Sequence, residues 1–141
     1  GMGTVPHGLI AAYGGDTVVA ARRFADRFAD ELNVTVLVDF ENDSVRTALE
    51  VADALGPRLW GVRLDTSSTM VDRSLWHEMG RFKPTGVVPE LVWKVRRALD
   101  NAGHGGVRIV ASGGFDARRI RAFEEAGVPV GAQWRWHLLA R

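Results

Sequence analysis

The chain has 141 residues, 46% of them hydrophobic, and its 18 basic and 17 acidic side chains leave a formal net charge of +1. This length fits one domain with its own core, and the balanced charge does not predict a nucleic-acid partner. The lack of cysteine excludes thiol catalysis, disulfides and cysteine-ligated zinc. No stretch is long and apolar enough to span a membrane and no signal peptide is visible, so we predict a cytoplasmic protein with no membrane partner.

Helical and strand patterns alternate from the start of the chain. The spacing of apolar residues predicts a helix over 16–32. The continuous apolar run of 34–39 predicts a strand that is buried on both faces. A second helix is expected over 44–55, with Ser44 as its N-cap and a Gly-Pro pair directly after its end.

The rest of the chain continues this alternation. Its expected elements are, in order, a strand (59–65), a polar insertion (66–86), a helix (89–103), a strand (108–114), a helix (117–127) and the start of a further strand (128–130). Strands that alternate with helices pair in parallel through right-handed crossovers. Two architectures fit this order, an open doubly wound sheet and part of a βα barrel.

Reactive side chains stand at the ends of three predicted strands. Asp39 ends the first, Arg63 and Asp65 end the second, and Ser112 ends the third. In both architectures, ligands bind at the carboxyl ends of parallel strands. A single one of these residues is equally well explained as a solvated strand end or a helix cap, but all three together favour a binding or catalytic site.

The segment SGGFD, residues 112–116, follows the last of these strands directly. Its two glycines leave backbone N–H groups uncovered ahead of a helix for which Asp116 is a good N-cap. Phosphate and other anions bind at such helix N-termini. The alternative is a tight strand-to-helix turn in which the glycines only relieve steric strain.

Four segments resemble the nicotinate phosphoribosyltransferase family and occur in the family's order: GTVPH (3–7), LVDF (37–40), GVRLDTS (61–67) and SGGFD (112–116). The resemblance covers about residues 3–130. It implies an irregular βα barrel, which the family joins to a separate N-terminal domain. It also implies transfer of nicotinate to the ribose of phosphoribosyl pyrophosphate, which gives nicotinate mononucleotide and pyrophosphate. In the family, ATP hydrolysis is coupled to this reaction through a phosphorylated histidine.

The resemblance also assigns roles to individual residues. His7 matches the phosphorylated histidine, and Asp39 and Asp65 match acidic positions at the reacting ribose, where they hold hydroxyls or magnesium. Arg63 matches the arginine that faces the pyridine ring and holds the nicotinate carboxylate. Substrate binding is further assigned to Thr66 and to a phosphate loop of Ser112, Gly113 and Gly114. The implied cofactors are Mg²⁺ and ATP, and no metal site made by the protein alone is assigned.

The chain departs from the family at its end. A complete βα barrel takes ~250 residues, so we expect an α/β fold with about half of a TIM-like barrel over 2–130, followed by a divergent tail over 131–141. Trp134–His137 do not resemble the glycine-rich loop that completes the phosphate site in the family. A shifted reading frame near Val130 is one explanation, and a true tail that caps the fold is the other.

The predicted function is therefore that of a nicotinate phosphoribosyltransferase of NAD biosynthesis, in the form of a truncated fragment that carries half of the active site. The alternative is a non-catalytic module that binds a phosphorylated ligand or a partner. Half a barrel leaves two sheet edges with unpaired N–H and C=O groups. A two-fold homodimer is the simplest way to cover them, and we expect one.

Overall fold

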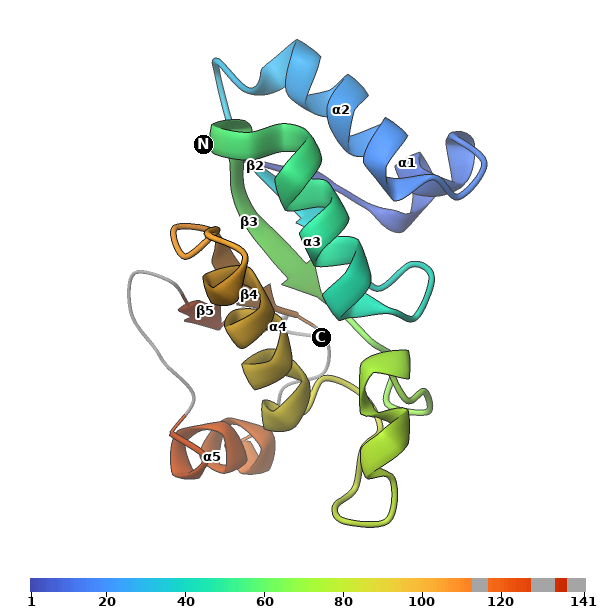
Figure 1. Ribbon diagram of the computed structural model, residues 1–141, viewed down its shortest axis with the longest axis vertical. Coiled ribbons are helices and arrows are strands. Elements are labelled where there is room, and N and C mark those ends of the chain that lie inside the picture. The colour runs from blue at the N-terminus through green and yellow to red at the C-terminus, as the bar shows by residue number, and fades with distance from the viewer. Residues whose placement is uncertain (113–116, 128–133, 137–141) are drawn as a thin grey trace.

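The computed structural model describes residues 1–112, 117–127 and 134–136, and it contains one sheet of five parallel strands in the order β1-β2-β3-β4-β5 (Figure 1). The strands are β1 (Met2–Val5), β2 (Asn33–Leu37), β3 (Leu59–Leu64), β4 (Arg108–Ala111) and β5 (Trp134–Trp136). The α-helices are α1 (His7–Ala12), α2 (Thr17–Phe28), α3 (Ser44–Leu55), α4 (Pro89–Asn101) and α5 (Ala117–Glu125). Two short 3₁₀ helices are η1 (Gly56–Arg58) and η2 (Arg73–Glu78).

The strand order decides between the two predicted architectures. Each strand pairs with the next one along the chain, whereas a doubly wound sheet reverses its strand order once. Helix α2 packs against α3 and α3 against α4, and all three lie in front of the same face of the sheet in Figure 1. This arrangement is that of a βα-barrel segment whose sheet is not closed, so the predicted fold class is confirmed.

The two faces of the sheet differ in chemistry. The face toward the helices carries buried apolar side chains, namely Val5, Val34, Val36, Val62, Leu64, Ile109 and Ala111. Gly3 is on this face too, because a Cβ there would lie 2.8 Å from Leu32 and 2.9 Å from Phe24. The opposite face is more polar, since Thr4, Thr35, Gly61 and Arg108 are register partners across four strands. The sequence thus separates a hydrophobic core from a polar inner face.

The predicted strand over 34–39 is buried as expected, because residues 34–37 of β2 are all buried. Helix α2 begins after Asp16, whose carboxylate accepts a hydrogen bond from the N–H of Val19. Helix α4 begins at Pro89, as predicted from the preference of proline for the first helical turn. Helix α3 ends at Leu55, and the C-cap residue that follows it, Gly56, has a φ of 57° that favours glycine.

The prediction that Ser44 caps α3 is wrong. Asp43 occupies the N-cap position and makes no side-chain capping bond, while Ser44 is the first residue of the helix. The N–H and the hydroxyl of Ser44 both donate to the carboxylate of Asp72, which is distant in the sequence. A carboxylate from a distant segment therefore accepts the hydrogen bond of the free backbone N–H at the helix start, and the serine that was predicted as the cap is itself a donor.

Several predicted features fall outside the described residues. These are Gly113, Gly114, Asp116 and the strand start at 128–130. Helix α1 was not predicted. Strand β5 belongs to the predicted tail and pairs in parallel with β4, so the tail adds a strand to the sheet. Within the described ranges, every helix is too short or too polar to cross a bilayer.

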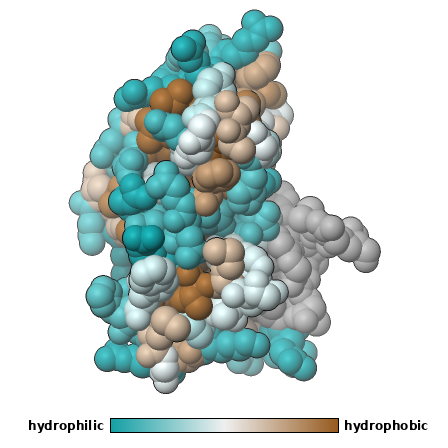
Figure 2. Space-filling view, turned by 90° about the vertical axis from the view of Figure 1, so that its right-hand side faces the viewer, coloured by the Kyte–Doolittle hydropathy of each residue, from teal (hydrophilic) through white to brown (hydrophobic). Residues whose placement is uncertain are grey.

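Figure 2 views the molecule from the side on which the loops after β2 and β3 lie in Figure 1. Hydrophilic side chains cover most of this side, and the hydrophobic ones form small, separate patches. Three exposed large hydrophobic residues belong to the polar insertion after β3, namely Met70, Trp76 and Met79. The insertion thus places both polar and apolar groups at the carboxyl end of the sheet.

Candidate functional site

A cavity of about 370 Å³ lies on the inner face of the sheet, opposite the helices. Its walls come from four strands and the residues that follow them: Met2, Thr4, Thr35, Arg63, Asp65, Val110 and Ser112. Three predicted site residues, Arg63, Asp65 and Ser112, are therefore brought together. The carboxyl end of the strands is where βα barrels bind their ligands.

Asp39 joins the ends of β2 and β3 next to this cavity. One of its carboxylate oxygens, Oδ2, accepts hydrogen bonds from the N–H of Asp65 at 2.7 Å and from the hydroxyl of Thr66 at 2.9 Å. The other oxygen, Oδ1, is buried and has no hydrogen-bond partner among the described residues. Asp39 thus has one oxygen fixed by the neighbouring strand end and one buried oxygen that lies 3.8 Å from His7 Nε2 and lacks a hydrogen bond among the described residues.

Burial raises the pKa of Asp39 above its ordinary value. The hydrogen bonds from Asp65 N–H and Thr66 and the charge of His7 act against this rise, and the charge of Asp65 adds to it. A carboxyl group held in a desolvated position beside a cavity is typical of functional sites. Asp39 is therefore better suited to hold a proton or a hydroxyl group than an exposed aspartate.

Replacing Asp39 with asparagine is expected to stabilise the fold at pH 7 by about 0.5–2 kcal/mol. Because the folded state raises the pKa of Asp39, it binds more protons than the unfolded state, and the free energy of unfolding falls as the pH rises from about 4 through that pKa. An asparagine oxygen can still accept from Asp65 and Thr66. Urea unfolding at pH 7 and pH 4 checks this, and the gain should shrink at pH 4. A variant less stable than the wild type at pH 7 would contradict it.

His7 lies beside Asp39, a proximity that the sequence did not predict. It is the first residue of α1, directly after β1, and its side chain is about half exposed. Its Nε2 atom is 3.8 Å from Asp39 Oδ1, which is longer than a hydrogen bond. Its ring packs at a tilt against Phe40, with 6.0 Å between centroids. The imidazole therefore remains accessible while its position next to Asp39 is fixed.

Arg63 presents its side chain to the cavity and has an unused donor there. Its Nε atom is buried without a hydrogen-bond acceptor among the described residues, and the hydroxyls of Thr4 and Thr35 are buried without partners as well. Buried polar groups are nearly always paired, so a ligand or water supplies the missing partners. Sequence reasoning missed the two threonines. The signal for them is the alternation of threonine and valine along β1 and β2, which places the valines toward the helices and the threonines on the inner face.

Thr66 and Ser112, two predicted substrate-binding residues, make contacts within the protein. The hydroxyl of Thr66 donates to Asp39, and Thr66 is not part of the cavity wall, so its contact with the site runs through that carboxylate. The N–H of Ser112 donates to the carbonyl of Leu64 at 2.8 Å and extends the pairing of β4 with β3. The hydroxyl of Ser112 donates weakly to the same carbonyl, at 3.4 Å, so a ligand in the cavity would have to compete with that contact. Gly113 and Gly114, the rest of the predicted phosphate loop, lie outside the described residues.

The described residues contain no group of three or more His, Cys, Asp or Glu side chains that could hold a metal ion. Mg²⁺ is commonly bound by one or two carboxylates together with substrate phosphates. Asp65 lines the cavity, and Asp39, which accepts from the Asp65 N–H, keeps one carboxylate oxygen without a hydrogen bond among the described residues; this pair fits a Mg²⁺ ion that arrives with a phosphorylated substrate. Asp39 and Asp65 would hold the ion, and it would neutralise charge on the phosphates.

A larger groove of about 720 Å³ lies on the helical side of the molecule, between α3, η2 and α4. Several of its charged side chains are already paired within the protein. Arg46 contacts three carboxylates, and Lys94 lies 2.9 Å from Glu78. The inner-face cavity, where buried polar atoms lack partners, is therefore the better candidate for a substrate site.

No protein-family model and no curated protein matches the chain. Among solved structures, it is similar to the crystal structure of nicotinate-nucleotide pyrophosphorylase from Pyrococcus furiosus, with a TM-score of 0.71 and 31% sequence identity. The match covers 96% of this chain and 30% of that chain, so this chain spans less than a third of its neighbour's length.

The structural neighbour and the sequence resemblance agree in part. The sequence resembles nicotinate phosphoribosyltransferases, and the neighbour is by name an enzyme of nicotinate nucleotide and pyrophosphate. The resemblance is thus confirmed as similarity to a related nicotinate-nucleotide enzyme, and the particular enzyme stays a prediction.

Proposed function

We propose that this chain carries part of the active site of a phosphoribosyltransferase of NAD biosynthesis that joins nicotinate to phosphoribosyl pyrophosphate. The observation that supports it best is the inner-face cavity, where the unpartnered Nε of Arg63 lies with Asp65 and Ser112 at the carboxyl end of the strands. The 31% identity with nicotinate-nucleotide pyrophosphorylase supports the proposal of a pyridine nucleotide as the class of ligand.

Each residue has a distinct task in this reaction. The guanidinium of Arg63 would pair with the nicotinate carboxylate and orient the pyridine nitrogen toward C1′ of the ribose. As that nitrogen forms a bond to C1′, the bond from C1′ to pyrophosphate breaks and positive charge develops on the ribose. Carboxylates of Asp39 and Asp65 stabilise this charge and accept hydrogen bonds from ribose hydroxyls. Ser112, with Gly113 and Gly114, would hold the 5′-phosphate.

We further propose that ATP hydrolysis is coupled to this reaction through phosphorylation of His7. His7 is about half exposed, so a phosphoryl group can reach its ring, and Asp39 Oδ1 lies 3.8 Å from its Nε2. A carboxylate beside a histidine helps to orient the ring. This geometry supports a phosphorylated His7.

A turnover assay tests the proposal. The full chain is incubated with nicotinate, phosphoribosyl pyrophosphate and Mg²⁺, with and without ATP, and nicotinate mononucleotide is measured. Product formation supports the enzyme, and a higher rate with ATP supports the role of His7. Calorimetry with nicotinate mononucleotide is the second measurement. Binding without turnover favours the non-catalytic module, which the unclosed sheet makes the second candidate. No binding and no turnover would overturn both.

We also propose that the chain forms a homodimer. Strands β1 and β5 are the two ends of the sheet, and no described strand pairs with their outer edges. Unpaired edges of this kind readily pair with another chain, and two-fold symmetry closes such contacts. Light scattering after size-exclusion chromatography should therefore give twice the mass of one chain. A single monomer peak at micromolar concentration would reject the homodimer.

A further inference from the structure

Two loops meet at the carboxyl end of the sheet, and each sends a carboxylate to the other. The first loop, residues 39–43, follows β2, and the second loop, residues 65–86, follows β3. Asp39 of the first loop accepts hydrogen bonds from the start of the second, as described above. Asp72 of the second loop makes the reverse connection to the end of the first.

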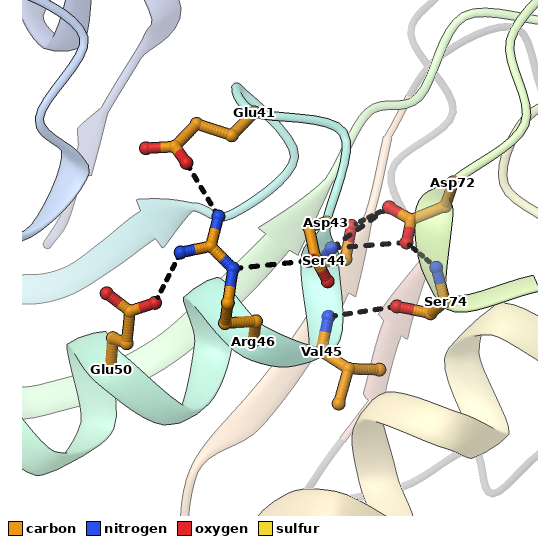
Figure 3. A network of polar contacts seen from close by, with 8 residues as sticks. All are labelled: Glu41, Asp43, Ser44, Val45, Arg46, Glu50, Asp72 and Ser74. Carbon is orange, nitrogen blue, oxygen red and sulfur yellow. Dashed lines mark hydrogen bonds and ion pairs between the residues drawn. The ribbon is translucent and has the colours of Figure 1, made fainter.

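Asp72 is completely buried, and its carboxylate accepts hydrogen bonds from Ser44 and Ser74 (Figure 3). Its Oδ2 accepts from the Ser44 N–H at 3.0 Å and from the Ser44 hydroxyl at 2.5 Å. Its Oδ1 accepts from the Ser74 N–H at 3.0 Å. The Ser74 hydroxyl in turn accepts from the Val45 N–H at 3.4 Å. Asp72 thus fixes the start of α3, and with it the end of the first loop, to the second loop.

Asn42 adds a second connection between the loops. Its side-chain amide donates to the Val71 carbonyl at 2.7 Å, and its own carbonyl accepts from the Arg73 N–H at 2.8 Å. Its φ of 56° is in the left-handed region, which asparagine tolerates better than most residues. The residues on both sides of Asp72 are therefore held against the first loop as well.

A different network lies on the exposed side of the same helix start (Figure 3). Arg46 contacts Glu41 at 2.6 Å, Asp43 at 3.2 Å and Glu50 at 2.8 Å. All three contacts stay within residues 41–50 and none of them reaches the second loop. Exposed ion pairs of this kind contribute little to stability. Glu41 therefore offers a control in the same loop for changes at Asp72.

We propose that Asp72 is a positioning residue for the inner-face site: by holding the two loops together, it keeps Asp39 in its hydrogen bonds with Thr66 and with Asp65, which lines the cavity. The role in substrate binding rests on the proposed function. The effect on Asp39 itself rests only on the contacts described here.

The short length of the first loop gives the physical reason why a change at Asp72 should reach Asp39. Asp39 begins the first loop and Ser44 follows its end, so only the four residues 40–43 separate the two carboxylate contacts along that chain. If the contact at Ser44 is weakened, the first loop can move away from the second. Asp39 Oδ2 would then lose its donors, the Asp65 N–H and the Thr66 hydroxyl.

The test is hydrogen exchange of the Asp65 N–H, which donates to Asp39 Oδ2. If Asp72 holds the two loops together, this proton should exchange at least several-fold faster in the Asp72→Asn variant than in the wild type. The Ser112 N–H, which donates to the Leu64 carbonyl between β4 and β3, is the internal reference and should exchange at an unchanged rate. No acceleration at Asp65, or an equal acceleration of both protons, in a folded variant would overturn the proposal.

Glu41→Gln is the matched control, since it also removes one negative charge and leaves the contacts between the loops intact. It should leave the exchange rate of the Asp65 N–H unchanged. If Asp72→Asn does not fold, as judged by circular dichroism, Ser44→Ala replaces it. That variant removes one donor to Asp72 and should give a smaller acceleration at Asp65, and no acceleration would overturn the proposal.

Calorimetry with nicotinate mononucleotide gives the second measurement. Asp72→Asn should weaken binding by about 10-fold or more, as expected for a residue that orients a binding group. Glu41→Gln should bind as the wild type does. If the wild type does not bind the nucleotide, the proposed function fails, and the exchange of the Asp65 N–H still decides the role of Asp72. Unchanged affinity in Asp72→Asn, with wild-type binding intact, would reject its role in the site.

Discussion

Replacing Arg63 with alanine is expected to weaken the binding of nicotinate by about 10- to 150-fold. A charge-assisted hydrogen bond to a carboxylate contributes about 1.5–3 kcal/mol, and the alanine variant loses it. The expectation rests on the position of Arg63 in the wall of the cavity and on its buried Nε, which has no acceptor among the described residues. Isothermal titration calorimetry with nicotinate measures the two affinities directly.

Two further variants separate the role of Arg63 from that of positive charge in general. Arg63→Lys keeps the charge and loses the planar fork, so its affinity should lie between those of wild type and alanine variant. Arg58→Ala removes an exposed arginine that pairs with Asp26 at the other end of β3. It should bind nicotinate as the wild type does. Equal affinity of Arg63→Ala and wild type would reject the assignment of Arg63 to the carboxylate.

The fold was predictable from sequence because its signals are local and repeated. The valine-rich run of β2 has the pattern of a strand buried on both faces, and Pro89 and Gly56 mark helix ends through backbone restrictions that need no tertiary context. Ser44 shows where this reasoning stops. Its donors go to Asp72, 28 residues further along the chain, and no local pattern predicts that pairing.

The candidate site was predictable to the extent that parallel strands bring their carboxyl ends together. Asp39, Arg63, Asp65 and Ser112 each follow or end a strand, and the structure gathers them at one edge of the sheet. Thr66 shows the limit, because its hydroxyl binds Asp39 and does not reach the cavity wall. Position relative to a strand end predicts proximity, whereas the direction of a side chain depends on contacts with other loops.

Replacing Arg96 with alanine is expected to lower the free energy of unfolding by about 3 kcal/mol. The side chain is 2% exposed and is one of the few buried charges in the described part of the chain. Its guanidinium donates to Asp100 at 2.9 Å, to the Val107 carbonyl at 2.6 Å, and more weakly to the carbonyls of His104 and Gly105. Alanine would leave the buried Val107 carbonyl and the part-buried carbonyls of His104 and Gly105 without this donor and would remove a fully packed side chain, which together cost several kcal/mol.

The effect of Arg96 should be specific to its position, because its neighbour on α4 is a matched control. Arg97 stacks on Trp93 at 5.4 Å and is partly exposed, so Arg97→Ala should cost less than about 1 kcal/mol. Urea unfolding followed by circular dichroism measures both variants, and a loss below about 1 kcal/mol for Arg96→Ala would contradict the expectation. Arg96 connects the end of α4 to the turn that leads into β4, and β4 leads to Ser112 at the cavity. A destabilised turn should therefore also loosen the strand that carries one wall of the candidate site.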